Sequence, residues 1–91
     1  MQQRMQPADV ICLCEAGGRI QPLRVRLMDE EQVYQRVDIE QILRRDEIHH
    51  TGAEAQIFLC RATVGEIPRV FELKYLLRSH RWYVQGDMRW I

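Results

Sequence analysis

The sequence lacks net charge, because its 13 basic residues balance 13 acidic ones among 91 residues. General nucleic-acid coat proteins and proteins that bind anionic membranes usually have strongly basic surfaces, so this balance argues against both classes. Long hydrophobic runs are missing as well. The longest uninterrupted apolar run spans residues 10–14, far below the roughly 18 residues that a membrane-spanning helix needs.

Signals for secretion and for disulfide bonding are also absent. The first residues, MQQRMQPAD, contain no apolar stretch of a secretory signal, so we expect a cytoplasmic protein. The three cysteines, Cys12, Cys14 and Cys60, form an odd number, which indicates reduced thiols rather than a disulfide framework. Cys12 and Cys14 do not have C-x-x-C spacing. On a strand they share one face, and we expect both to be small core residues.

Lysine is nearly missing, whereas arginine is abundant: Lys74 is the only lysine among the 13 basic residues. Arginine is suited to bidentate contacts with carboxylates or phosphates, although codon usage in a GC-rich genome produces the same bias. A hydrophobic fraction of 46% is enough for a packed core, and the length is that of one domain. We expect a loose tail at 1–7, one domain at 8–85 and a C-terminal tail at 86–91.

Short segments bounded by turn signals predict β-strands along most of this domain. In residues 19–29, Leu23, Val25 and Leu27 alternate with polar positions, and Pro22 indicates an edge or a bulge because proline cannot donate to a ladder. In residues 54–63, Phe58 shares a face with Cys60 and Ala62. The remaining clear strands are residues 8–15, 69–78 and 81–85.

Residues 32–50 are compatible with two structures. Ile39 and Ile42 follow the three-residue step of a helix, and Asp38 could cap a short helix at 38–46. Val33, Val37 and Ile39 follow the two-residue period of a strand equally well. A strand would need a bulge between Ile39 and Ile42, and we favour this bulged strand over the helix.

Five or six short strands and no confident long helix predict a mainly β fold, a small antiparallel barrel or sandwich. Three segments resemble parts of a group of small bacterial domains of unknown function that are proposed to form SH3-like barrels. Residues 18–26 resemble their first hairpin arm, residues 33–43 their central strand, and residues 69–84 their closing hairpin. The resemblance covers about residues 9–85; it implies a fold and supplies no catalytic residues.

Residues able to support catalysis or metal binding are present without a recognised motif. The sequence has no G-x-S-x-G, P-loop, G-x-G-x-x-G or H-E-x-x-H motif, so we expect neither an enzyme nor a cofactor. We also expect no metal site, because the candidate ligands lack standard zinc spacing. Acidic residues between 29 and 47 are interpreted as a solvated face. The candidate metal ligands are Cys12, Cys14, Cys60, His49, His50 and His80.

Charge is distributed unevenly along the chain. Residues 1–28 and 48–91 each carry a net charge of +2, whereas residues 29–47 carry −4. The two basic portions are the predicted first and closing hairpins, and the closing hairpin interleaves cations with aromatic rings. We therefore predict an interaction face made of Arg24, Arg26, Lys74, Arg78, Arg81, Trp82 and Tyr83. Alternatively, Trp82 and the other rings pack in the core and the arginines are simply solvated.

These features favour a non-enzymatic interaction module that binds a protein partner or associates with itself. Leu76, Trp90 and Ile91 are apolar residues that could contribute to such contacts. One alternative is a barrel that binds single-stranded DNA or RNA through the interleaved cations and rings. A second alternative is a cysteine- and histidine-dependent thiol or metal protein.

Overall fold

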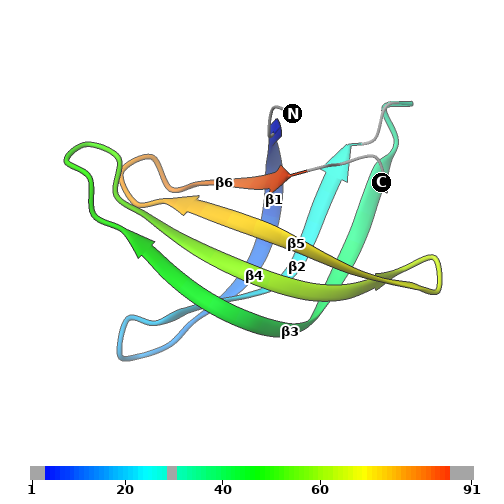
Figure 1. Cartoon of the computed structure of the whole chain (residues 1–91), viewed down its shortest axis with the longest axis horizontal. Coiled ribbons are helices and arrows are strands. Elements are labelled where there is room, and N and C mark those ends of the chain that lie inside the picture. The colour runs from blue at the N-terminus through cyan, green and yellow to red at the C-terminus, as the bar shows by residue number, and fades with distance from the viewer. Residues whose placement is uncertain (1–3, 29–30, 87–91) are drawn as a thin grey trace.

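The computed structural model describes residues 4–28 and 31–86, which form six antiparallel strands and no helix. Each strand pairs with the next, and β6 pairs with β1, so the sheet closes into a barrel (Figure 1). This confirms the predicted small antiparallel barrel and is consistent with an SH3-like fold. Within the described ranges there is no helix that could cross a membrane. The strands are β1 (Arg4–Cys14), β2 (Ile20–Met28), β3 (Tyr34–Ile48), β4 (Ala55–Val64), β5 (Ile67–Leu76) and β6 (Arg81–Gly86).

β1 and β3 are long strands that each pair with two neighbours over different halves. In β1, residues 9–14 pair with β2, whereas residues 4–8 pair with β6. In β3, residues 34–38 pair with β2, whereas the part from Ile39 onward pairs with β4. β1 therefore connects the first hairpin to the last strand, as Figure 1 shows.

The ambiguous segment is the bulged strand rather than a helix at 38–46. The β3–β4 register shifts between Ile39 and Gln41 and again between Ile42 and Arg44. The extra residues change the phase of the strand, so Ile39 and Ile42 both pack against the core although they are three residues apart. A bulge therefore reproduces the spacing that resembled a helical turn.

A further bulge lies at Pro22, as expected, and it corrects the predicted grouping of residues on one face of β2. Ile11 pairs with Arg24 while Cys12 pairs with Pro22, which leaves Leu23 as the extra residue. Pro22 is buried, and Leu23 is 42% exposed. Leu23 therefore does not share the inner face with Val25 and Leu27, because the bulge reverses the alternation at this point.

The N-terminal segment expected to be a loose tail differs in part. β1 begins at Arg4, and residues 4–7 continue the ladder with β6, from Arg4 opposite Gly86 to Pro7 opposite Tyr83. Strand pairing overrides the polar composition and the proline that suggested a tail, because Pro7 lies near the end of this ladder. Residues 1–3 and the expected tail residues 87–91 lie outside the described residues.

The core is formed by the inward side chains of all the strands, centred on Phe58. Phe58 is 1% exposed, and its ring lies 5.8 Å from that of Trp82. The buried cluster comprises Val25, Leu27, Val37, Phe58, Cys60, Ala62, Phe71, Leu73 and Val84. Cys12 and Cys14 are not among them: Cys12 is half-buried and Cys14 is exposed, which corrects the expectation of two core cysteines.

Arg45 on β3 connects the first hairpin, at the start of β2, to the core residue Phe58 on β4. Its Nη1 donates a hydrogen bond to the Ile20 carbonyl oxygen at 2.7 Å, and its guanidinium lies 5.1 Å from the centroid of the Phe58 ring. Desolvation of this half-buried cation, with a further contribution from Arg19, lowers the pKa of Arg45. The contact closes the barrel where β2 and β3 are no longer paired.

Replacement of Arg45 should loosen this closure without unfolding the chain. Arg45→Met keeps the apolar stem but removes the hydrogen bond and the cation–π contact, so we expect a loss of about 1–2 kcal/mol in unfolding free energy. Amide hydrogen exchange should accelerate most at residues 14–20. Urea denaturation of Arg44→Met is the control, because the Arg44–Asp46 ion pair is exposed and such pairs contribute about 0–1 kcal/mol.

Candidate interaction face

Alternation along β2 places Arg24 and Arg26 on the outer surface of the barrel, where each meets a carboxylate on a neighbouring strand. Arg24 Nε lies 2.6 Å from Asp38 Oδ1 on β3. Arg26 donates through Nε and Nη2 to Asp9 Oδ2 on β1, at 3.0 and 2.5 Å. The Asp9 hydrogen bond raises the pKa of Arg26, so this guanidinium is a permanent charge.

β1 brings the last strand to the same surface. Arg36, Arg26 and Asp9 are register partners across β3, β2 and β1. Arg81 stands just beyond the Ala8–Trp82 pair of the β1–β6 ladder, beside Asp9. A hollow of about 400 Å³ is lined by Asp9, Val10, Ile11, Arg24, Arg26 and Arg36. A second hollow, of about 510 Å³, shares Asp9 and Val10 and includes Arg81 and Tyr83.

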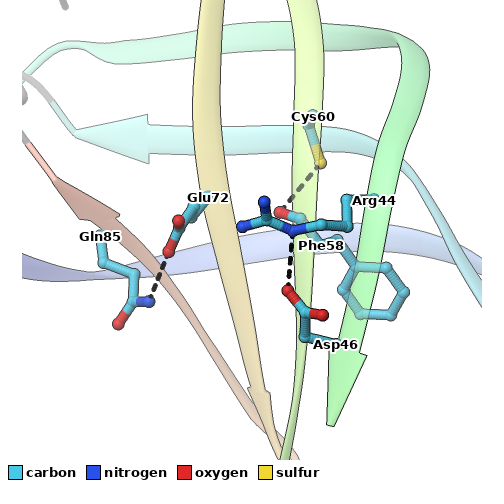
Figure 2. Close-up of polar contacts among 6 residues, drawn as sticks. All are labelled: Arg44, Asp46, Phe58, Cys60, Glu72 and Gln85. Atoms are coloured by element: carbon cyan, nitrogen blue, oxygen red, sulfur yellow. Dashed lines mark hydrogen bonds and ion pairs between the residues drawn. The ribbon is translucent and has the colours of Figure 1, made fainter.

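The surface continues across β6 to β5. Lys74 on β5 is the register partner of Tyr83 on β6, and both side chains are half-buried. In the next outward pair along these strands, Gln85 donates to Glu72 at 3.0 Å (Figure 2). The outward side chains of five adjacent strands, β3, β2, β1, β6 and β5, therefore include a set of basic and aromatic residues, here called the basic face: Arg24, Arg26, Arg36, Lys74, Arg81 and Tyr83.

Two residues of the predicted interaction face lie elsewhere. Trp82 points into the barrel, where its ring packs on Phe58 and lies 4.7 Å from the ring of Tyr75. Arg78 is exposed in the turn between β5 and β6. Five of the seven predicted residues are thus brought together, and Trp82 follows the alternative in which it is a packing residue.

The sequence reasoning missed Arg36, Asp9 and Tyr34. The alternation of residues 33–39 could have assigned Arg36 to the outer face. The assignment was not made because this segment was compatible with both a helix and a strand. Tyr34 is 54% exposed, and the Arg26 guanidinium lies 4.4 Å from its ring centroid. Asp9 could not be found from spacing, because its partners come from β2 and β6.

Exposed apolar side chains accompany the basic face. Met5 and Ile11 on the outer surface of β1 are 47% and 57% exposed, and Leu13 on the same strand is 50% exposed. Leu76, which was expected to contribute, is half-buried in β5. Trp90 and Ile91 lie outside the described residues.

The thiols and histidines do not converge. Among residues 4–28 and 31–86, no three His, Cys, Asp or Glu side chains are placed to hold a metal ion. Burial raises the pKa of Cys60 to about 12, and burial together with Cys14 raises the pKa of Cys12. Both shifts disfavour the thiolate that cysteine nucleophiles and metal ligands require.

The acidic segment forms local pairs on the surface. Asp38, Asp46 and Glu47 are exposed; Asp46 accepts from Arg44 at 2.8 Å (Figure 2), and Glu47 lies 3.0 Å from His49 Nε2. These contacts agree with a solvated charged surface.

Comparison of the chain with protein-family models, with curated proteins and with solved structures gives no match.

Proposed function

We propose that this chain is a non-enzymatic interaction module whose basic face binds an acidic segment of a partner protein that also carries apolar side chains. The observation that carries the proposal is the cross-strand row Arg36–Arg26–Asp9 on β3, β2 and β1, which lies beside exposed apolar residues of β1. Arg81 on β6 lines a hollow together with Asp9. Cations supply the attraction for partner carboxylates, and the apolar residues supply burial on binding.

The apolar component favours a protein over a nucleic acid. Met5, Ile11 and Leu13 are close to half exposed, and no phosphate backbone would gain from covering them. Exposed apolar groups gathered beside charged ones are typical of protein-binding surfaces.

The carboxylates of the face do not distinguish the two partners. Asp9 and Asp38 lie among the arginines at 2.5 and 2.6 Å from their partners, and they would repel a phosphate strand and an acidic peptide alike. The outward ring Tyr34 already has a guanidinium stacked on it, and Trp82 is directed into the core. Single-strand binders instead combine unobstructed rings with an uninterrupted cationic groove.

The free thiols and the resemblance to small bacterial domains support a bacterial cytoplasm as the location of this protein. Free Cys12, Cys14 and Cys60 suit a reducing compartment such as a bacterial cytoplasm. The resemblance supports a barrel used as a module and assigns no ligand to it.

Fluorescence anisotropy with a short labelled peptide of alternating glutamate and leucine tests the proposal. The wild-type chain should bind this peptide, and Arg36→Glu/Arg81→Glu should weaken binding more than tenfold, which corresponds to about 1.4 kcal/mol. Arg36 and Arg81 make no ion pair with another described residue, so their replacement should leave folding intact.

A control variant, a control peptide and an RNA probe show which results would contradict the proposal. Arg61→Glu/Arg78→Glu changes the net charge equally but lies outside the basic face, and its binding should equal that of wild type. A peptide of alternating glutamate and serine should bind more weakly, because it offers no apolar side chain. Tight, steeply salt-dependent binding of oligouridylate without binding of the glutamate–leucine peptide would instead establish the nucleic-acid function.

A further inference from the structure

The second half of β1 has one edge without a strand partner. Residues 9–14 pair with β2 on one side, but the ladder with β6 ends at Ala8. Within the described part of the chain, β1 contacts no strand other than β2 and β6. The inward side chains Val10 and Cys12 are half-exposed.

This edge also lacks the usual protection. Natural edge strands carry charged residues, prolines or bulges that discourage pairing with another chain. Residues 10–14, Val-Ile-Cys-Leu-Cys, contain no charge and no proline, and they form the longest apolar run in the sequence. The bulge at this point lies in β2, at Leu23, so β1 itself keeps a regular strand.

Other unpaired stretches of the described strands are protected. β5 before Glu72 has no β6 partner, but it contains Pro68 and Arg69. The part of β3 that β4 leaves unpaired contains Arg36 and Asp38. The contrast singles out residues 10–14 as the edge suited to accept a strand.

We propose that a second copy of this chain pairs with this edge, antiparallel, and forms a two-fold dimer through β1. When Cys12 lies opposite Cys12 of the other protomer, the apolar run 10–14 of each strand pairs along its full length with the same run of the other strand. Ile11 then faces Leu13 of the other protomer on the outer surface, and Val10 faces the other Cys14 on the inner surface. Apolar cross-strand pairs of this kind stabilise antiparallel sheets.

The charges that flank the run are compatible with this register. Asp9 is placed opposite Glu15 of the other copy, which alone would be repulsive. Each carboxylate, however, has an arginine in its own protomer: Arg26 lies 2.5 Å from Asp9, and Arg19 lies 3.9 Å from Glu15. The strand pairing uses main-chain groups and does not depend on the function proposed above, although the added strand lies beside Arg81 and uses Ile11 and Leu13, which that function also uses.

Sedimentation equilibrium of the full chain tests the dimer. The wild type should associate reversibly, and Ile11→Lys should raise the dimer dissociation constant at least tenfold, since it places a charge in the centre of the edge. Ile11 is 57% exposed, so the variant should keep the circular dichroism of the wild type. Val70→Lys alters a matched apolar residue, 55% exposed on β5, and should leave association unchanged.

Thiol cross-linking tests the register. Directly opposed residues in an antiparallel pair have Cα atoms about 4.5–5.5 Å apart, within the range that a disulfide spans. Diamide, which takes up the two thiol hydrogens, should therefore link Cys12 to Cys12 in Cys14→Ser and give no covalent dimer in Cys12→Ser. A wild type that stays monomeric, a dimer dissociated equally by Val70→Lys, or cross-linking that survives Cys12→Ser would each overturn the proposal.

Discussion

Phe58→Ala should lower the free energy of unfolding by about 3–5 kcal/mol, the range found when a buried aromatic side chain is removed. Phe58 is 1% exposed, contacts the Trp82 ring and lies under the Arg45 guanidinium, so its removal leaves a cavity that three strands line. Small domains have total stabilities of about 5–15 kcal/mol, so a loss of this size removes a large part of the stability.

Urea denaturation followed by circular dichroism measures this loss. Val70→Ala is the matched control, because Val70 is an apolar strand residue that is 55% exposed, and we expect a change within about 0.5 kcal/mol. Equal effects of the two substitutions would mean that the core is not centred on Phe58.

The second large effect is a loss of stability at alkaline pH that depends on Cys60. Its thiol is buried and directed to the Phe58 carbonyl oxygen at 3.6 Å, as Figure 2 shows. Burial raises the pKa of Cys60 from its ordinary value of 9.0 to about 12. The folded state thus favours the neutral thiol, whereas the unfolded chain releases the proton at lower pH.

The sign of the pH dependence follows from this difference. The contribution of Cys60 to stability is complete below pH 9 and is lost as the pH rises toward 12. Since one pKa unit corresponds to about 1.4 kcal/mol, the loss should reach roughly 4 kcal/mol. Unfolding free energies of wild type and Cys60→Ala, measured at several pH values, should converge at high pH.

Val70→Ala provides the control for this titration. Val70 is 55% exposed and has no titratable group, so its replacement should leave the alkaline profile unchanged. If Cys60→Ala loses stability with pH as steeply as wild type does, then Cys12, tyrosine, lysine or arginine titration causes the alkaline loss and Cys60 does not.

The strands could be predicted where alternation is regular, and the errors lie where it is interrupted. Phe58, Cys60 and Ala62 were placed on one shared face correctly because β4 pairs with β5 without a register shift, and the structure shows that this face is the inner one. Leu23 was wrongly grouped with Val25 and Leu27, because it is the extra residue of the bulge and faces outward whereas the two later residues face inward. The helix-like step from Ile39 to Ile42 has the same cause, since local spacing does not distinguish a bulge from a turn.

The candidate site depended on topology more than on pattern. Arg24 and Arg26 could be assigned to one face from the period of their own strand. Their proximity to Arg81 could not, because it results from the way β1 changes partner between Ala8 and Asp9. Trp82 was assigned to the interaction face from its cationic neighbours in sequence, although alternation within β6 already favoured an inward ring.

Nuclear magnetic resonance chemical-shift mapping with the glutamate–leucine peptide tests the central claim most directly. The titration should perturb the amides of Arg24, Arg26, Arg36, Arg81 and Tyr83 and leave those around Arg61 on the far side of the barrel unchanged. Perturbations centred on Arg61 and Val70, or no perturbation at peptide concentrations that saturate the anisotropy signal, would contradict the claim that the basic face is the binding surface.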